Sequence, residues 1–373
     1  MIIGVPKEVK THEYRVGLTP TSVREVAAHG HKVLIERNAG NGIGAADSAY
    51  EKAGARIVDD VFAEAELIVK VKEPQREERK KLKEKHVLFT YLHLAPDPEQ
   101  TRDLAASGAI CIAYETVTSA RGGLPLLAPM SEVAGRMSVQ VGASCLEKGR
   151  GGMGILLGGV AGVPPAKITV LGAGVAGSSA IRLAVGSGAR VYALDRSVEV
   201  LRNIEREFGA RVVTVFSSRD AVEQNVLSAD LVIGAVLVPG AAAPKLVTRQ
   251  MVKDMKPGSV VVDIAIDQGG CLETSRPTTH ADPTYLVDGV VHYCVTNMPG
   301  AVPRTSTYAL NNATLPFVLA LADKGWKRAL ADDPHLKNGL NVARGKITHA
   351  EVAAALSSTT GAPYFPAEEV ILG

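Results

Sequence analysis

Residues 167–195, KITVLGAGVAGSSAIRLAVGSGARVYALD, constrain the fold more than any other part of this sequence. The stretch begins with an apolar, β-branched run, turns through a GxGxxG pattern that starts at Gly172, and continues as an alanine-rich helical segment. A second apolar run then ends at Asp195. This order of strand, glycine turn, helix and strand, with an acid at the end, is typical of a βαβ unit that binds a dinucleotide.

The glycines and the acid would have separate roles in such a site. Gly172 allows a tight turn, Gly174 lets a pyrophosphate approach the backbone, and Gly177 lets helix and strand pack closely. The N–H groups at the helix start favour the phosphate charge. Asp195 would accept hydrogen bonds from the adenosine ribose and repel a 2′-phosphate, which favours NAD over NADP, although the adjacent Arg196 can accept that phosphate. The alternative for Asp195 is a solvated carboxylate at a strand end.

Composition and charge argue against several classes of protein. The 373 residues are enough for two domains, and 46% hydrophobic with 21% charged residues is ordinary globular composition. A formal net charge of +2 gives no electrostatic basis for binding nucleic acid or a membrane. The N-terminus lacks a signal-peptide pattern, and no apolar run reaches the ~18–20 residues that span a bilayer. The four cysteines have no CxxC spacing, so we expect reduced thiols, no metal site and a cytoplasmic protein.

The first third of the chain alternates strand-like and helical segments, which predicts a mainly parallel sheet with helices on both faces. The predicted strands are residues 2–5, 32–35, 67–71, 86–92 and 109–113. Arg15 lies in the loop after the first of these strands, Lys72 follows the third and His93 follows the fourth. Because ligands bind outside the carboxyl ends of such strands, we expect these side chains to form a site. The alternatives are a surface ion pair for Arg15, a surface position for Lys72 and a structural role for His93.

The second domain has the pattern of a two-halved dinucleotide-binding sheet. Its predicted strands are residues 168–171, 191–194, 212–215, 231–233, 260–264 and 291–295. Asp267 lies in a glycine-flanked loop at a strand end, where a reacting group is usual; its alternative is an Asx-turn that caps local N–H groups.

We therefore predict an α/β protein with two doubly wound domains. A Rossmann NAD-binding domain, residues 129–304, is inserted in a discontinuous Rossmann-like catalytic domain, residues 1–128 and 305–373. Connecting helices are predicted at about residues 131–148 and 306–324.

Longer motifs make the chain similar to a known family. The segments GVPKEVKTHEYRVGLTP, VKVKEP, FTYLHLA, LAPMSEVAGR, GAVLVPGAAAPKLV, DIAIDQGGC, SRPTTH and NMPGAVPRTSTYAL resemble alanine dehydrogenase, and the resemblance extends to about residue 340. It implies NAD-dependent oxidative deamination of L-alanine to pyruvate and ammonium, and the reverse reductive amination. It also implies a homohexamer.

The resemblance assigns roles to individual residues. Arg15 in EYRV and Lys72 in KVKEP match the substrate-binding residues, while His93 in YLHLA and Asp267 in AIDQGG match the catalytic ones. Val200 stands where some relatives carry a lysine, so we expect weaker adenosine binding or a compensating side chain. The residues matched to the cofactor site are Ser131, Val175, Asp195, Ser217, Ser218, Val236, Leu237, Ile264, Ala265, Ile266, Asp267, Arg276, Val295, Thr296, Asn297 and Met298.

Physical chemistry supports these roles. A guanidinium clamps a carboxylate through two parallel charged hydrogen bonds, as Arg15 would for a 2-oxo acid. Lys72 would hold the same carboxylate or polarise the carbonyl oxygen of the substrate. The His93 imidazole would exchange a proton with this carbonyl oxygen near neutral pH. Asp267 would orient ammonia and stabilise positive charge on the iminium, while hydride passes between the nicotinamide and the substrate carbon. Two cations favour a small, monoanionic substrate.

Three other functions remain compatible with parts of this pattern. A 2-hydroxy-acid dehydrogenase could use a similar Arg/His/Asp set without needing ammonium. The hydride-transferring part of proton-pumping transhydrogenase resembles the chain around RVGLTP and the glycine turn. A non-catalytic NAD sensor would bind NADH without turnover.

Overall fold

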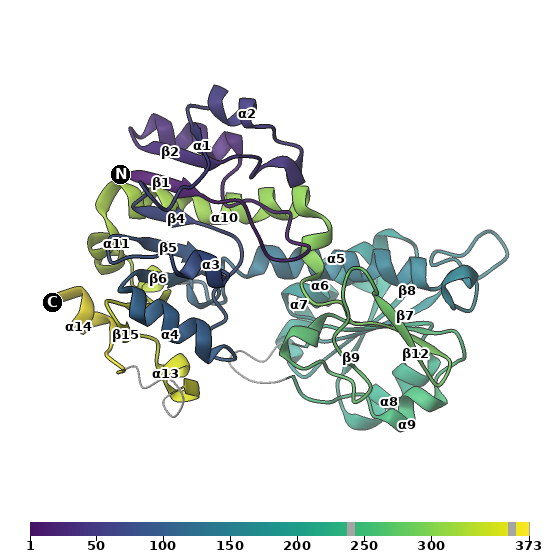
Figure 1. The fold of residues 1–373 in the computed structure, drawn as a ribbon. Coiled ribbons are helices and arrows are strands. Elements are labelled where there is room, and N and C mark those ends of the chain that lie inside the picture. The colour runs from purple at the N-terminus through teal and green to yellow at the C-terminus, as the bar shows by residue number, and fades with distance from the viewer. Residues whose placement is uncertain (237–242, 357–362, 373) are drawn as a thin grey trace. The chain divides into compact units, whose positions relative to one another are not determined.

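The computed structural model describes residues 1–236, 243–356 and 363–372 (Figure 1). The chain divides into two compact units: unit 1 comprises Met1–Met130 and Val302–Gly373, and unit 2 comprises Ser131–Ala301. Each unit is a mainly parallel sheet with helices packed on it, which confirms the predicted α/β fold class.

The sheet of unit 1 is doubly wound. Its parallel strands are β1 (Ile2–Val5), β2 (Lys32–Glu36), β3 (Arg56–Val58), β4 (Leu67–Val69), β5 (Val87–Thr90) and β6 (Ile110–Ala113), in the order β3-β2-β1-β4-β5-β6. The antiparallel strands β14 (Leu340–Ala343) and β15 (Lys346–Ile347) extend the sheet beyond β6. Because the chain order reverses between β1 and β4, the crevice for a ligand is expected at their carboxyl ends.

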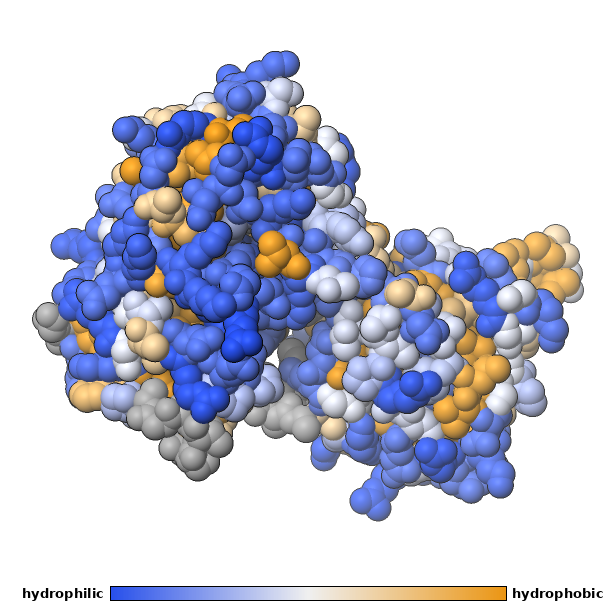
Figure 2. Space-filling model, viewed as in Figure 1, coloured by the Kyte–Doolittle hydropathy of each residue, from blue (hydrophilic) through white to orange (hydrophobic). Residues whose placement is uncertain are grey.

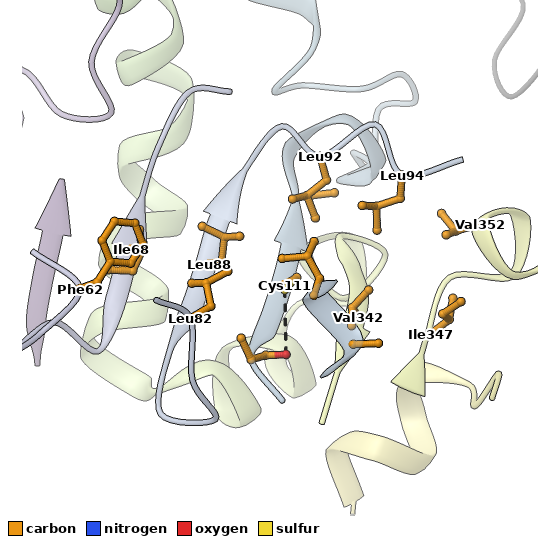
Figure 3. Close-up of a cluster of buried hydrophobic side chains, with 14 of the residues drawn as sticks. Phe62, Ile68, Leu82, Leu88, Leu92, Leu94, Cys111, Val342, Ile347 and Val352 are labelled. Atoms are coloured by element: carbon orange, nitrogen blue, oxygen red, sulfur yellow. Dashed lines mark hydrogen bonds between the residues drawn. The ribbon is translucent and has the colours of Figure 1, made fainter. Parts of the chain in front are cut away.

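The core of unit 1 explains why its strands read as continuous apolar runs. Ile68 of β4, Leu88 of β5 and Cys111 of β6 belong to one buried cluster (Figure 3). Strands covered by helices on both faces have no polar side to alternate with the apolar one. Leu92 and Leu94 extend the cluster past the end of β5, so this loop is anchored in the core as firmly as the strand.

Local sequence accounts for the ends of the helices in unit 1. The Thr19 hydroxyl accepts from the Ser22 N–H and Pro20 occupies the first turn, which starts α1. The Asp97 carboxylate caps α4 in the same way. The helices are α1 (Pro20–Ala28), α2 (Asp47–Lys52), α3 (Arg76–Arg79), α4 (Pro98–Ser107), α10 (Pro303–Lys324), α11 (Trp326–Asp332), α12 (Pro334–Lys337), α13 (Ala350–Leu356) and α14 (Ala367–Leu372).

The sheet of unit 2 repeats the strand order of unit 1. Its parallel strands are β7 (Lys167–Leu171), β8 (Arg190–Asp195), β9 (Val212–Phe216), β10 (Leu231–Gly234), β11 (Val260–Asp263) and β13 (Val290–Tyr293), in the order β9-β8-β7-β10-β11-β13. Strand β12 (Thr284–Val287) pairs antiparallel with β13 at the edge. The helices are α5 (Ala128–Cys145), α6 (Val175–Gly186), α7 (Val198–Phe208), α8 (Arg219–Ser228) and α9 (Arg249–Asp254). The reversal between β7 and β10 places the glycine turn at the switch point.

The two connecting helices differ from their predicted bounds. The helix predicted at about residues 131–148 is α5, which starts at Ala128 because Pro129 fits the first turn, where no N–H partner is needed. The boundary between the units falls within this helix. The helix predicted at about residues 306–324 is α10, which starts at Pro303 for the same reason.

The length and apolar character of the helices in the described ranges decide whether any of them can cross a bilayer. Hydrophilic residues dominate the face drawn in Figure 2, and hydrophobic residues form scattered patches. Across those ranges, no helix is both long enough and apolar enough to cross a bilayer. The four cysteines are buried as free thiols.

Candidate functional site

The glycine turn of unit 2 has the geometry that its sequence predicts. Gly172 has a φ of 88°, a left-handed conformation that favours glycine, and its N–H donates to the Leu194 carbonyl at 2.8 Å. A Cβ on Gly177 would lie 1.8 Å from the Gly172 carbonyl oxygen. Helix α6 therefore approaches the turn as closely as glycine permits.

Gly174 differs from Gly172 and Gly177 because the protein itself does not exclude a side chain there. A Cβ built on it would meet no described atom within 4 Å, so the protein itself leaves space there. Gly174 precedes α6, and Val175 at the helix start is 46% exposed. The first N–H groups of α6 thus face an open position, which suits a phosphate group.

Asp195 ends β8 beside this turn. One carboxylate oxygen accepts the Ala173 N–H at 2.8 Å, and the other accepts the Ser197 N–H at 2.8 Å. Asp195 is therefore tied to the glycine turn and to the start of α7, and is more than a solvated strand-end acid. A carboxylate has about four lone-pair sites, so both oxygens retain capacity for ribose hydroxyls. The Ser217 N–H donates to the Asp195 carbonyl at 3.0 Å, and Ser218 caps α8 at the same edge.

The other predicted cofactor residues that the structure describes lie in α5 and at several loops of unit 2. The Cα of Val236 would be 3.1 Å from a Cβ on Gly172, which places it against the glycine turn. Ser131 lies within α5, and Leu237 lies outside the described residues. The Arg276 guanidinium stacks 4.1 Å from the centroid of the Tyr285 ring.

The loop after β13 carries the last group of predicted cofactor residues. Val295 and Met298 are both buried, and Val295 pairs with Thr278 in an isolated β-bridge. The Thr296 N–H donates to the Thr278 carbonyl at 3.2 Å, and Asn297 has a positive φ of 56°. This segment is therefore held in a defined conformation.

Asp267 lies on a 3-10 turn, Ile264–Gln268, that follows β11. Ile264 is half-buried, and Ala265 and Ile266 point into the core and anchor the turn, while the Asp267 side chain is exposed. Its carboxylate is thus displayed on a short segment attached directly to a strand end, as the sequence predicts.

Asp263 holds this turn in place, and the sequence reasoning missed it. The buried carboxylate accepts from the Ala265 N–H at 3.1 Å, the Cys271 N–H at 2.9 Å and the Ser275 hydroxyl at 2.5 Å. Burial raises the pKa of the Asp263 carboxyl, although these donors lower it in part. An acid that ends an all-apolar strand just before a glycine-rich loop is the signal that could have identified it.

In unit 1, Arg15 is buried rather than exposed as a surface ion-pair partner. The Glu13 carboxylate accepts from Nε and from Nη2 of Arg15, each at 2.6 Å. Burial alone would lower the pKa of the Arg15 guanidinium, but the Glu13 carboxylate outweighs burial and raises it. Nη1 lies 3.0 Å from the Met130 sulfur. The Arg15 guanidinium, called the Arg15 fork below, is therefore charged and fixed in orientation, which the motif EYRV did not reveal.

Lys72 follows β4 beside a buried group of charges. The Lys70 ammonium lies 2.6 Å from Glu78 Oε1 and 3.2 Å from Glu8 Oε2. Burial lowers the pKa of Lys70, but Glu8 and Glu78 outweigh burial and raise it. Burial raises the pKa of Glu8, and the attraction of Lys70 offsets this only in part. The Lys72 carbonyl accepts from the Thr90 hydroxyl at 2.9 Å.

His93 is presented outward by its neighbours in the chain. Leu92 and Leu94 are buried on either side of it, while the His93 side chain is 47% exposed and its φ is 50°. The His93 backbone N–H donates to the Glu115 carboxylate at 2.6 Å, and the imidazole Nδ1 lies 4.0 Å from the same carboxylate. The imidazole stacks on Tyr91 with 5.9 Å between ring centroids and 7° between planes.

Tyr91 links two of the predicted residues of unit 1. Besides stacking on His93, it lies close enough to Arg15 for the guanidinium to lower its pKa, although burial raises the pKa of the phenol overall. The Tyr91 hydroxyl donates to the Leu126 carbonyl, which fixes the ring. His93 therefore stacks on a buried, fixed ring in unit 1, whereas Asp267 belongs to unit 2.

Comparison with known proteins gives a consistent result over both units. A family model described as alanine dehydrogenase/PNT, N-terminal domain, matches residues 4–134, and one described as alanine dehydrogenase/PNT, C-terminal domain, matches residues 138–350. An alanine dehydrogenase of Halomonas elongata is 62% identical over 95% of this chain and 96% of its own length.

Solved structures extend the comparison to the fold. A structure described as L-alanine dehydrogenase is 52% identical, with a TM-score of 0.93 over 96% of this chain and 99% of its own. A transhydrogenase from Sinorhizobium meliloti is 28% identical, with a TM-score of 0.80 over 94% of this chain and 99% of its own. The chain is therefore similar to both proteins along nearly its whole length, and the identity is higher to the first.

Proposed function

The chain belongs to the alanine dehydrogenase/PNT family, and we propose that it catalyses the NAD-dependent oxidative deamination of L-alanine to pyruvate and ammonium, and the reverse reaction. The observation that carries this proposal is the buried Arg15 guanidinium, which Glu13 holds in one orientation in unit 1. A fixed guanidinium at strand ends is suited to a small carboxylic acid.

Unit 2 supplies the features that a nicotinamide nucleotide needs. The open position at Gly174 and the N–H groups at the start of α6 fit a pyrophosphate, and Asp195 fits a ribose with free hydroxyls. We assign NAD rather than NADP because the Asp195 carboxylate would repel a 2′-phosphate. When bound, the nicotinamide accepts hydride from the substrate carbon, or donates it in the reverse direction.

The residues of unit 1 bind and orient the substrate. Arg15 clamps the carboxylate of pyruvate or alanine, and Lys72 adds a second positive charge beside the carboxylate or the carbonyl oxygen. Two cations facing one short acid favour a monoanionic substrate such as pyruvate. The Tyr91 ring stacks on the His93 imidazole, and the Glu115 carboxylate accepts from the His93 backbone N–H. Together these contacts orient the imidazole.

His93 and Asp267 handle the protons and the amine. The His93 imidazole protonates the substrate oxygen as water leaves in reductive amination, and removes that proton when water adds in the deamination. Asp267 orients ammonia and stabilises the positive charge of the iminium. The deamination consumes L-alanine, NAD⁺ and water and yields pyruvate, ammonium, NADH and one proton, so charges and atoms balance.

The test is NADH oxidation by the purified protein with pyruvate, in the presence and absence of ammonium. We expect oxidation only when ammonium is present, and a much slower reaction with NADPH. Oxidation without ammonium would support a 2-hydroxy-acid dehydrogenase. NADH binding without any turnover would support a sensor, and hydride exchange between two nucleotides without pyruvate would support the transhydrogenase activity.

The family relationship also leads us to propose a homohexamer. Light scattering of the protein in solution measures its mass directly, and a mass of one or two chains would contradict this part of the proposal.

A further inference from the structure

Unit 1 contains a buried group of three charges that the proposed chemistry does not use. The ammonium of Lys70 is fully buried between the carboxylates of Glu8 and Glu78, which are themselves almost completely buried. Removing three charges from water is costly, and well-packed apolar side chains of similar volume stabilise a core at least as well. The group therefore needs an explanation other than stability.

The Glu8 carboxylate does more than neutralise Lys70. Its Oε1 accepts from the Val71 backbone N–H at 2.7 Å and from the Lys72 backbone N–H at 3.4 Å. Its Oε2 accepts from the Lys70 ammonium. The Glu8 carboxylate thus accepts hydrogen bonds from the side chain of Lys70 and from the backbone N–H groups of Val71 and Lys72. The Thr90 hydroxyl bonds the Lys72 carbonyl at 2.9 Å, so the Lys72 backbone is held on both sides.

We propose that Glu8, anchored by Lys70, is a positioning residue that fixes the backbone at Lys72 and thereby the direction in which this lysine reaches the substrate. The inference rests on the proposed substrate-binding role of Lys72. Charged acceptors make the stronger hydrogen bonds to backbone N–H groups, and Lys70 is what keeps a charged acceptor in this buried position.

Glu78 provides a matched comparison because it contacts the same ammonium but a different segment. Its second oxygen accepts the Gln75 N–H at 2.8 Å and caps α3. Removing either carboxylate leaves Lys70 paired with the other one. Only the removal of Glu8, however, takes away the acceptor of the Val71 and Lys72 backbone N–H groups.

The experiment compares Glu8→Ala, Glu8→Gln and Glu78→Ala with the wild-type protein. We expect Glu8→Ala to raise the KM for pyruvate by about tenfold or more, because small displacements of a substrate-positioning group have large effects. Glu78→Ala should leave this KM within about twofold. It should lower the melting temperature about as much as Glu8→Ala does, because each variant removes one carboxylate from Lys70. Glu8→Gln keeps an oxygen that can accept the Val71 N–H but loses the charge and turns an NH2 group toward the Lys70 ammonium, so it should recover only part of the loss.

A second measurement does not depend on turnover. The rate at which acetic anhydride modifies Lys72 is followed by mass spectrometry, with the exposed Lys253 of unit 2 as internal reference. We expect Glu8→Ala to change this rate by about threefold or more and Glu78→Ala to leave it unchanged, since reactivity follows the environment of the amine. Equal effects of the two variants on the KM and on the Lys72 rate would overturn the inference. If the wild-type protein shows no ammonium-dependent turnover, the proposed function fails, and the Lys72 rates alone decide whether Glu8 positions this lysine.

Discussion

The two units share one strand order but differ in the groups that they carry at the reversal of that order. In unit 1 the reversal between β1 and β4 is surrounded by charged side chains, including the Arg15–Glu13 pair and the Lys70 group. In unit 2 the reversal between β7 and β10 is surrounded by glycines and backbone N–H groups. The same doubly wound sheet therefore presents mainly charged side chains in one case, and in the other mainly backbone groups with one acid, Asp195.

This difference shows how function is added to a fold. The sheet fixes where a ligand can bind, at the carboxyl ends of strands beside the reversal, while the residues at that edge decide which ligand binds. A short carboxylic acid offers little surface, so it requires charge. A dinucleotide offers a pyrophosphate, for which a helix N-terminus without side chains is sufficient.

The sharpest separation of the two units is expected from His93→Ala. Loss of the proton-transferring group should lower kcat by about 10³-fold, in the middle of the range for a general acid–base residue. The dissociation constant for NADH, measured by fluorescence titration, should stay within about twofold because the glycine turn lies in the other unit. His29→Ala is the control, since His29 is an exposed histidine of unit 1 that bonds Asp323. A variant at His93 with near-normal kcat would remove it from the mechanism.

Arg15→Lys should give the next largest effect. It keeps a positive charge but loses the planar fork that Glu13 orients, so the KM for pyruvate should rise by about 30- to 100-fold, as expected for lost charged hydrogen bonds. Glu13→Gln should act in the same direction by about tenfold, because the fork remains but its charged partner does not. Steady-state kinetics with saturating NADH and ammonium measure both values. An unchanged KM in Arg15→Lys would contradict the clamp.

The glycines of unit 2 should separate binding from folding. Gly177→Ala places a methyl group 1.8 Å from the Gly172 carbonyl oxygen, so both the melting temperature and NADH affinity should fall. Gly174→Ala meets no described atom within 4 Å, so it should leave the melting temperature unchanged but weaken NADH about tenfold by blocking the phosphate. Gly186→Ala, near the end of α6, is the control and should change neither. Equal losses of stability at Gly174 and Gly177 would mean that the open position is not reserved for a nucleotide.

Asp195→Asn should have the smallest effect on turnover with NADH. The carboxamide oxygen can still accept one backbone N–H at the glycine turn, but the charge that repels a 2′-phosphate is gone. The ratio of kcat/KM for NADH to that for NADPH should therefore fall by about tenfold. Measuring both nucleotides on the same preparation provides the comparison, and an unchanged ratio would refute the ribose assignment.

Much of the fold is predictable because its central strands are buried on both faces. Runs such as residues 168–171 and 231–233 are almost entirely apolar, and apolar runs bounded by glycine turns predict parallel strands well. The strands β3, β12 and β15 are short or partly exposed, and they lie at or near sheet edges. Their sequences lack a clear pattern, so the prediction missed them. It also missed β14, which is buried but lies far along the chain from the strand that it pairs with.

The sequence alone determined the local features of this protein: the glycine turn with its terminal acid, and the positions of Arg15, Lys72, His93 and Asp267 in segments that follow strands. These depend on residues that are neighbours in the chain. The Glu13–Arg15 and Asp263–Cys271 bonds join residues only two and eight positions apart, so they too are local. Only the tertiary structure decided that Lys70 is buried against Glu8, 62 positions away, and that Arg15 Nη1 contacts the Met130 sulfur, 115 positions away. Such contacts arise from the order in which strands are placed side by side, and no local pattern of apolar and polar residues encodes that order.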